Sequence, residues 1–108
     1  MLVALALVVA VPTGMATTEP DLLVGVDVAL KPDAVTLSST HVKRGHYVEF
    51  KLRNTTTSRR MFSLAGRTVT VPPRKFRFLV IMFDFRGKYA YMSRLASGAA
   101  VRGTFTVS

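Results

Sequence analysis

Cysteine is missing from this 108-residue sequence, and so is tryptophan. Without a thiol, the sequence excludes disulfide bonds, thiolate metal sites and cysteine nucleophiles. Acidic residues are scarce, since six Asp and Glu stand against fifteen Lys and Arg. Stability must therefore come from packing, and a chain of this length suffices for one domain with its own hydrophobic core but not for two.

A helical pattern is also missing, because no window of helical length carries apolar residues at the spacing of an amphipathic helix. Short alternating segments separated by turn residues are present instead. In the clearest of them, 46–53, Val48, Phe50 and Leu52 point to one side and charged residues to the other. The expected strands are 22–30, 34–43 with a bend at Ser38-Ser39, 46–53, 60–64, 69–71, 76–81, 89–92 and 103–107. This pattern predicts an all-β sandwich.

The segment 76–81 is apolar enough on both sides to be partly covered on both. Basic residues alternate with aromatic ones over Arg74–Phe78, a composition that suits nucleic acid. Phe76 and Phe78 are more simply explained as core residues, and we expect no nucleic-acid partner.

The N-terminal segment is an unbroken apolar run, Leu2–Val11, followed by Pro12 and by small residues at Gly14 and Ala16. This pattern predicts a secretory signal peptide, residues 1–16, although no Lys or Arg precedes the run. The run is shorter than the roughly 20 residues of a transmembrane helix, so we expect no membrane span after cleavage. The predicted mature domain is 17–108, secreted or periplasmic. The alternative is that the run forms a buried first strand.

Positive charge is concentrated in the body of the predicted domain. From Lys43 onward, fourteen basic residues face only Glu49 and Asp84. A field of this sign favours anionic partners, and we expect an anionic cell-envelope component or an acidic protein. The alternative is a solvated basic face that only keeps the protein soluble.

Three pieces of the sequence, in this order and spacing, resemble the cupredoxins, the small blue-copper proteins related to plastocyanin. The pieces are the strand–glycine–strand segment 42–50 with Asn54 after it, Val71-Pro72-Pro73 followed by 76–78, and the closing hairpin made of 87–91 and 103–107. The resemblance covers essentially all of 17–108. It implies a Greek-key β-sandwich with a cupredoxin-like fold.

The resemblance also implies where a copper site would lie. A blue-copper site needs one thiolate and two imidazoles, usually with a weak axial thioether. With the segment 93–101 taken as the family's final loop, the four ligand positions fall on Arg60, Ser93, Ala96 and Val101. None of these side chains ligates copper as the family's do, and the permanent charge of Arg60 repels a cation. We therefore expect no metal and no cofactor.

Two other sets of side chains could supply metal ligands. Met61 and Met92 flank two of the four positions and would suit a Cu(I) thioether site, but strand alternation puts them on the opposite face. His41 and His46 lie on one hairpin that the fold would place away from the final loop. The alternative function is a plastocyanin-like electron-transfer or copper-handling protein with a non-standard ligand set.

Arginines surround the expected copper-site end: Arg59, Arg60 and Arg94, with Arg102 nearby. Guanidinium groups beside the N–H groups of a glycine-containing loop form a predicted cradle for a carboxylate or phosphate oxygen. The alternative is that the Arg60 stem covers the edge of the core while its head reaches solvent.

Catalytic patterns are lacking. The chain order supports no Ser-His-Asp triad, the acidic residues show no pairing suited to acid–base catalysis, and a phosphate-binding glycine loop is absent. We therefore do not expect an enzyme. Asn54-Thr55-Thr56 matches a glycosylation acceptor and is otherwise a turn. The sequence as a whole predicts a secreted, copper-free cupredoxin-like domain that acts as a binding or structural module.

Overall fold

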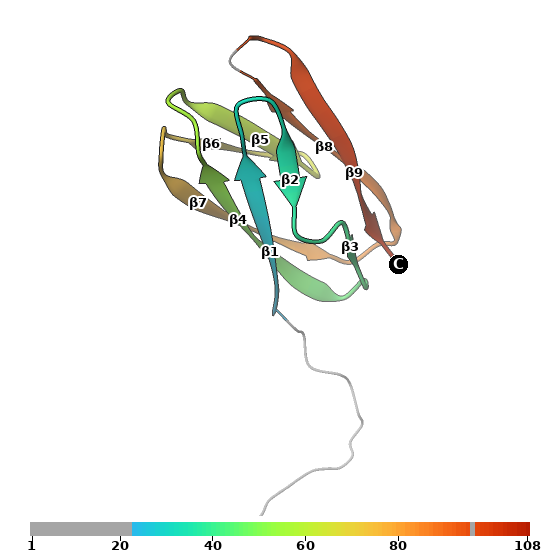
Figure 1. Cartoon of the computed structure of the whole chain (residues 1–108). Coiled ribbons are helices and arrows are strands. Elements are labelled where there is room, and N and C mark those ends of the chain that lie inside the picture. The colour runs from blue at the N-terminus through green and yellow to red at the C-terminus, as the bar shows by residue number, and fades with distance from the viewer. Residues whose placement is uncertain (1–22, 96) are drawn as a thin grey trace, which may run out of the picture.

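The structure, a computed structural model, describes residues 23–95 and 97–108 (Figure 1). The predicted signal peptide 1–16, residues 17–22 and Ala96 lie outside the described residues. Within the described residues the chain forms only strands. No helix among them is long and apolar enough to cross a membrane.

The strands agree with the sequence prediction to within a few residues. They are β1 (Leu23–Leu30), β2 (Val35–Leu37), β3 (His41–Val42), β4 (His46–Asn54), β5 (Arg60–Leu64), β6 (Arg67–Val71), β7 (Phe76–Phe83), β8 (Gly87–Arg94) and β9 (Ala100–Val107). The expected bend near Ser38-Ser39 divides 34–43 into β2 and β3, which belong to different sheets. This crossing ties the two layers together early in the chain.

The two sheets face each other as a sandwich (Figure 1). One has four strands in the order β2-β1-β4-β7, and the other has five in the order β3-β9-β8-β5-β6. The pairs β1–β4 and β3–β9 are parallel and the remaining pairs are antiparallel. The predicted all-β Greek-key sandwich is therefore confirmed.

The core between the sheets is built on Phe50, Phe62, Phe83 and Phe105, all of them buried. The Phe50 and Phe105 rings meet edge to face with centroids 5.3 Å apart, and the Phe83 and Phe105 rings stack at 5.4 Å. These are favoured aromatic geometries, which add to the energy gained from burial alone. Without a disulfide, these rings supply the main contact between the layers.

The prediction that Phe76 and Phe78 belong to the core is wrong. β7 turns Leu79, Ile81 and Phe83 inward, whereas Phe76 and Phe78 are 44% and 50% exposed. Their rings meet edge to face, and the Lys51 ammonium lies 4.8 Å from the Phe76 centroid. A strand that is apolar on both faces carries no alternation to orient it, so only its pairing with β4 decides which face is buried. Phe76 and Phe78 thus form part of an exposed surface together with basic residues. The absence of a nucleic-acid partner stays a prediction.

The loop predicted at 93–101 is also shorter than expected. β8 continues to Arg94 and β9 begins at Ala100, with Ser93 paired to Val101 and Arg94 to Ala100. The connection is 95–99, closed by hydrogen bonds from Leu95 N to Ala99 O and from Gly98 N to Leu95 O. The ladder thus extends through two residue pairs, four positions in all, that were expected to lie in the loop.

Four connections gather at one end of the sandwich, at the top of Figure 1: 31–34, 55–59, 72–75 and 95–99. They meet there because β1 runs parallel to β4, β7 starts beside the end of β4, and β5 starts beside the end of β8. We call this the Arg60 end, after the residue that begins β5.

A prediction concerns Gly103, which faces Tyr91 across the β8–β9 pair. A Cβ at Gly103 would overlap the Tyr91 ring, which stacks on Phe62 with centroids 5.8 Å apart. Gly103→Ala should therefore lower the free energy of unfolding by about 1–3 kcal/mol in urea denaturation. Gly25→Ala is the matched control, because a Cβ there meets no atom within 4 Å. Equal effects of the two substitutions would contradict the proposed ring contact.

Candidate functional site

Arg60 is the largest fully buried side chain of the Arg60 end, with 2% of its surface exposed. Alternation along β5 places it in phase with buried Phe62 and Leu64, so its stem enters the sandwich. Its guanidinium donates from Nε to the carbonyl of Arg94 at 2.7 Å and from Nη1 to the carbonyl of Lys31 at 2.6 Å. The Arg60 head is thus held inside the protein, and the alternative in which it reaches solvent is not what the structure shows.

The charge on Arg60 has only neutral partners among the described residues. Its third contact is a long one, 3.4 Å from Nη2 to the Ser93 hydroxyl. Burial lowers the pKa of Arg60 because desolvation disfavours the charged form. Arginine nevertheless remains protonated, so the site carries a positive charge that its hydrogen bonds spread but do not neutralise.

The structure brings together three of the four positions that the resemblance assigned to copper ligands. Ser93 is fully buried and touches Arg60, and Val101 lies directly opposite Ser93 in the β8–β9 ladder. Ala96 lies outside the described residues. A guanidinium, a hydroxyl and an isopropyl group do not fit copper, which takes thiolate and imidazole ligands and is repelled by a fixed cation.

The other candidate ligands do not converge on Arg60. Met61 is 42% exposed. Met92 pairs with Ser63, which lies two residues after Met61 and on the same face of β5. Both thioethers therefore lie on the outer face of the five-stranded sheet. His41 pairs with Thr106, and His46 pairs with Phe83, at the other end of the sandwich. Within residues 23–95 and 97–108, no group of three or more His, Asp or Glu side chains has an arrangement that could hold a metal ion.

The four arginines of the predicted anion cradle are divided by the sheet. Arg60 points inward, whereas Arg59, Arg94 and Arg102 are exposed. Arg102 pairs with Met92 and Arg94 pairs with Ala100, so these two arginines are diagonal neighbours on the outer face of the five-stranded sheet. The Arg94 guanidinium donates to the Gly98 carbonyl at 3.1 Å. The structure thus brings Arg94 and Arg102 together on one face and leaves Arg60 on the other.

A hollow of about 230 Å³ opens beside Arg60. It is lined by Pro32, Thr55, Thr56, Thr57, Ser58, Arg60 and Arg74. Two of these are arginines and none is acidic. Sequence reasoning missed Arg74 and the 55–58 hydroxyls, because it grouped arginines around the closing loop. Strand pairing brings them together: the parallel β1–β4 pair places 31–34 beside 55–58, and the antiparallel β4–β7 pair places 72–75 there.

The 54–58 loop that forms one wall of this hollow is held by Asn54, which is 1% exposed. Its Nδ2 donates to the carbonyls of Ser58 at 2.8 Å and Val71 at 3.0 Å, and its Oδ1 accepts from the Thr56 N–H and hydroxyl at 2.9 and 2.7 Å. The glycosylation match at Asn54 is therefore buried and serves as a structural turn.

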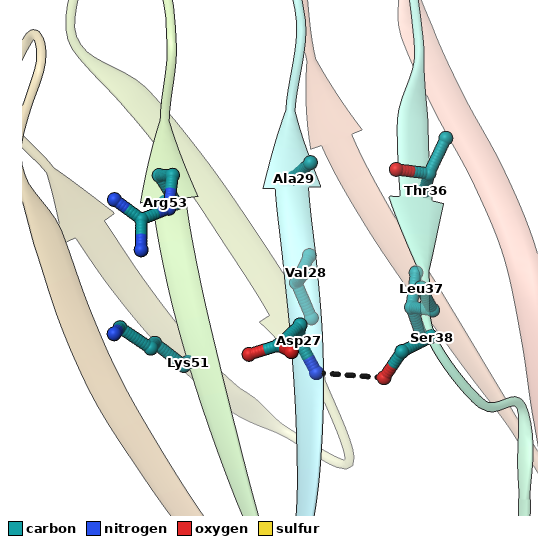
Figure 2. Close-up of a pocket in the computed structure, with 8 residues that line it drawn as sticks. All are labelled: Asp27, Val28, Ala29, Thr36, Leu37, Ser38, Lys51 and Arg53. Carbon is teal, nitrogen blue, oxygen red and sulfur yellow. Dashed lines mark hydrogen bonds between the residues drawn. The ribbon is translucent and has the colours of Figure 1, made fainter.

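A second hollow, of about 480 Å³, lies on the outer face of the four-stranded sheet and crosses β2, β1 and β4 (Figure 2). The hollow forms at Ala29, whose small side chain leaves space between its paired neighbours Thr36 and the larger Arg53. Figure 2 shows Asp27 in this hollow, between Ser38, whose hydroxyl accepts from the Asp27 N–H at 2.9 Å, and Lys51. With a carboxylate among two basic residues, this hollow has mixed charge and favours no single ion.

No protein-family model and no curated protein sequence matches this chain. Solved structures do. A heme-copper terminal oxidase is similar with a TM-score of 0.68 and 15% identity, over 91% of this chain and 79% of the oxidase chain. The Cu-containing nitrite reductase from Thermus scotoductus SA-01 has a TM-score of 0.54 and 17% identity, over 82% of this chain and 28% of its own.

A multi-copper oxidase from Pediococcus acidilactici is similar with a TM-score of 0.53 and 11% identity, over 98% of this chain. This chain spans 31% of that oxidase, so there and in the nitrite reductase it matches one part of a much longer protein. These structures have the cupredoxin fold, and the predicted cupredoxin-like fold of this chain is confirmed. At such low identity the likeness establishes the fold and leaves the function to the site.

Substitutions at Arg60 should separate the stability contributed by its aliphatic stem from that contributed by its guanidinium. Arg60→Ala removes both and should lower the free energy of unfolding by at least about 3 kcal/mol, because it leaves a cavity and unpaired carbonyls. Arg60→Met keeps most of the stem and should cost about 1–2 kcal/mol. Both values come from urea denaturation. Equal losses for Ala and Met would show that the packing of the stem is unimportant.

Asn54→Ala should be destabilising by about 2–4 kcal/mol, because it leaves the buried Val71 carbonyl and Thr56 donors without their partner. Thr57→Ala serves as the control, since Thr57 lies in the same loop, is exposed, and its hydroxyl makes no hydrogen bond within the described part of the chain. We expect it to change stability by less than about 0.5 kcal/mol in the same thermal or urea measurement. A small effect at Asn54 would contradict its role as the tie of this loop.

Proposed function

We propose that this protein is an extracytoplasmic, copper-free cupredoxin-like domain that acts as a binding or structural module. In this proposal the Arg60 end recognises an anionic group on a cell-envelope component or an acidic protein partner. Catalysis is not part of the proposed role. The predicted signal peptide supports the location, and the confirmed fold supports the comparison with copper proteins.

The observation that carries the proposal is the buried Arg60 guanidinium, hydrogen-bonded to Arg94, Lys31 and Ser93. It occupies the region to which the resemblance assigns the metal. Arg60 Nη2 lies 3.4 Å from the Ser93 hydroxyl, and its fixed positive charge would repel a copper ion from that region. The same charge attracts anions, so Arg60 disfavours a bound metal ion and favours an anionic partner.

The surface charge supports the second half of the proposal. The described residues hold all fifteen Lys and Arg, and most of these are exposed. The described acidic residues are Asp27, Asp33, Glu49 and Asp84. This excess produces a positive potential that accelerates the encounter with an anionic surface and weakens with added salt.

A copper titration tests the proposal. Added Cu(II) or Cu(I) should give neither an intense visible charge-transfer band nor a submicromolar binding isotherm with the purified protein. The matched control is the double variant Arg60→His/Ser93→Cys, which puts an imidazole and a thiol at two contacting positions and should acquire copper–thiolate absorption. A submicromolar isotherm for the wild-type protein would overturn the proposal in favour of a copper-handling role with a non-standard ligand set.

A further inference from the structure

We infer that the hollow between Arg60 and Arg74 is a binding site for a tetrahedral oxyanion, either free phosphate or the phosphate group of a larger molecule. The inference rests on the proposed function, because it assigns the Arg60 charge to anion binding instead of metal exclusion alone. It moves the predicted cradle from the exposed face of Arg94 and Arg102 to the inner edge of the sandwich.

Arg60 supplies the first reason. A guanidinium has five N–H groups, and the three hydrogen bonds of Arg60 use one N–H on each nitrogen. One N–H on Nη1 and one on Nη2 therefore have no partner among the described residues. Because Arg60 lines the hollow while only 2% of its surface is exposed, an anion seated there would meet a guanidinium whose own contact with water is small.

Arg74 supplies the second guanidinium. It occupies the third position of the turn Pro72–Lys75, which is closed by a hydrogen bond from Lys75 N to Pro72 O at 3.2 Å. Its φ of 61° is in the left-handed region, which glycine normally fills at this position of a turn. Holding an arginine there costs stability, and Pro72-Pro73 keep the chain in that shape. The strained backbone places the Arg74 side chain at the hollow.

The hydroxyl-rich wall is divided into supporting and available groups. The Thr55 hydroxyl donates to the Leu30 carbonyl at 3.2 Å, and the Thr56 hydroxyl to Asn54 Oδ1 at 2.7 Å. These bonds fix the loop. The hydroxyls of Thr57 and Ser58 have no hydrogen-bond partner within the described part of the chain, so they are free to donate to an oxyanion.

Charge and size narrow the ligand. Asp33 lies next to Pro32 in the chain but does not line the hollow, whereas the larger hollow on the outer face contains Asp27. A volume of about 230 Å³ is below the roughly 300–1,000 Å³ of clefts that enclose drug-sized ligands. The site thus suits a small anion or one charged group of a larger molecule. Two guanidiniums with two hydroxyls match the several acceptor oxygens of phosphate better than the two of a carboxylate.

Titration of the whole purified protein with inorganic phosphate, at constant ionic strength, tests the inference by calorimetry. We expect saturable binding at one site. Arg74→Gln should weaken it at least about tenfold, the size of a lost charge-assisted hydrogen bond. Arg86→Gln is the matched control, since it removes the same charge from an exposed turn at the opposite end of the sandwich and should leave the affinity unchanged. Ser58→Ala, a small change in the wall, should weaken binding less than Arg74→Gln.

Vesicles distinguish the two sources of phosphate. Retention on phosphatidylcholine vesicles that contain phosphatidylglycerol, lost in Arg74→Gln and competed by inorganic phosphate, identifies a lipid headgroup. Phosphate binding without such retention identifies a soluble phosphate. The inference is overturned if the wild-type protein shows no saturable phosphate binding, or if Arg74→Gln and Arg86→Gln weaken binding equally. Either result leaves the copper-free module standing when the copper titration is also negative, whereas copper binding overturns both.

Discussion

The hydrogen bonds of the Arg60 guanidinium organise the end of the sandwich where the function is proposed. This side chain starts from β5 in the five-stranded sheet, reaches the Lys31 carbonyl at the end of β1 in the other sheet, and also holds the Arg94 carbonyl at the end of β8. Elsewhere the layers meet through apolar side chains, with the phenylalanine rings at their centre. At the Arg60 end they are joined by one planar cation, whose fixed fork of donors sets the positions of both carbonyls.

A second polar residue completes this frame. Asn54 closes β4 and ties its loop to the Ser58 and Val71 carbonyls, while the Asn54 N–H donates to the Lys75 carbonyl at 2.9 Å. The 55–58 wall and the 72–75 turn are therefore fixed to the same side chain and backbone. Buried polar groups that are satisfied in this way favour one geometry, because any shift leaves a donor or acceptor unpaired. The hollow between these two segments is consequently formed before any ligand arrives, which reduces the entropy cost of binding.

Alternation predicted the parts of the fold in which one face is apolar and the other polar, as in 46–53 and 60–64, and the closing hairpin followed from Gly87, Tyr89 and Gly103. It failed at 76–81, where both faces are apolar and the pairing with β4 chooses between them. The expected loop 93–101 is too long, because β8 and β9 stay paired through Ser93–Val101 and Arg94–Ala100. For the site, the phase of Arg60 with Phe62 was visible in the sequence. Its carbonyl partners were not, because Lys31 and Arg94 lie 29 and 34 residues away and only the finished topology brings them together.

The difference between a metal and a guanidinium at the same end of a fold has an electrostatic consequence. A copper ion bound by a thiolate has part of its charge neutralised by its own ligand. Arg60 is held instead by two carbonyls and a hydroxyl, which satisfy its donors but supply no negative charge. Under the proposed function, this exchange leaves a buried positive charge in place of a nearly balanced site. Desolvation of that charge is costly, and an oxyanion in the adjacent hollow would offset part of the cost. An anion site beside Arg60 would therefore account for an arginine at a position where a neutral side chain of similar length would avoid the cost of desolvating a charge.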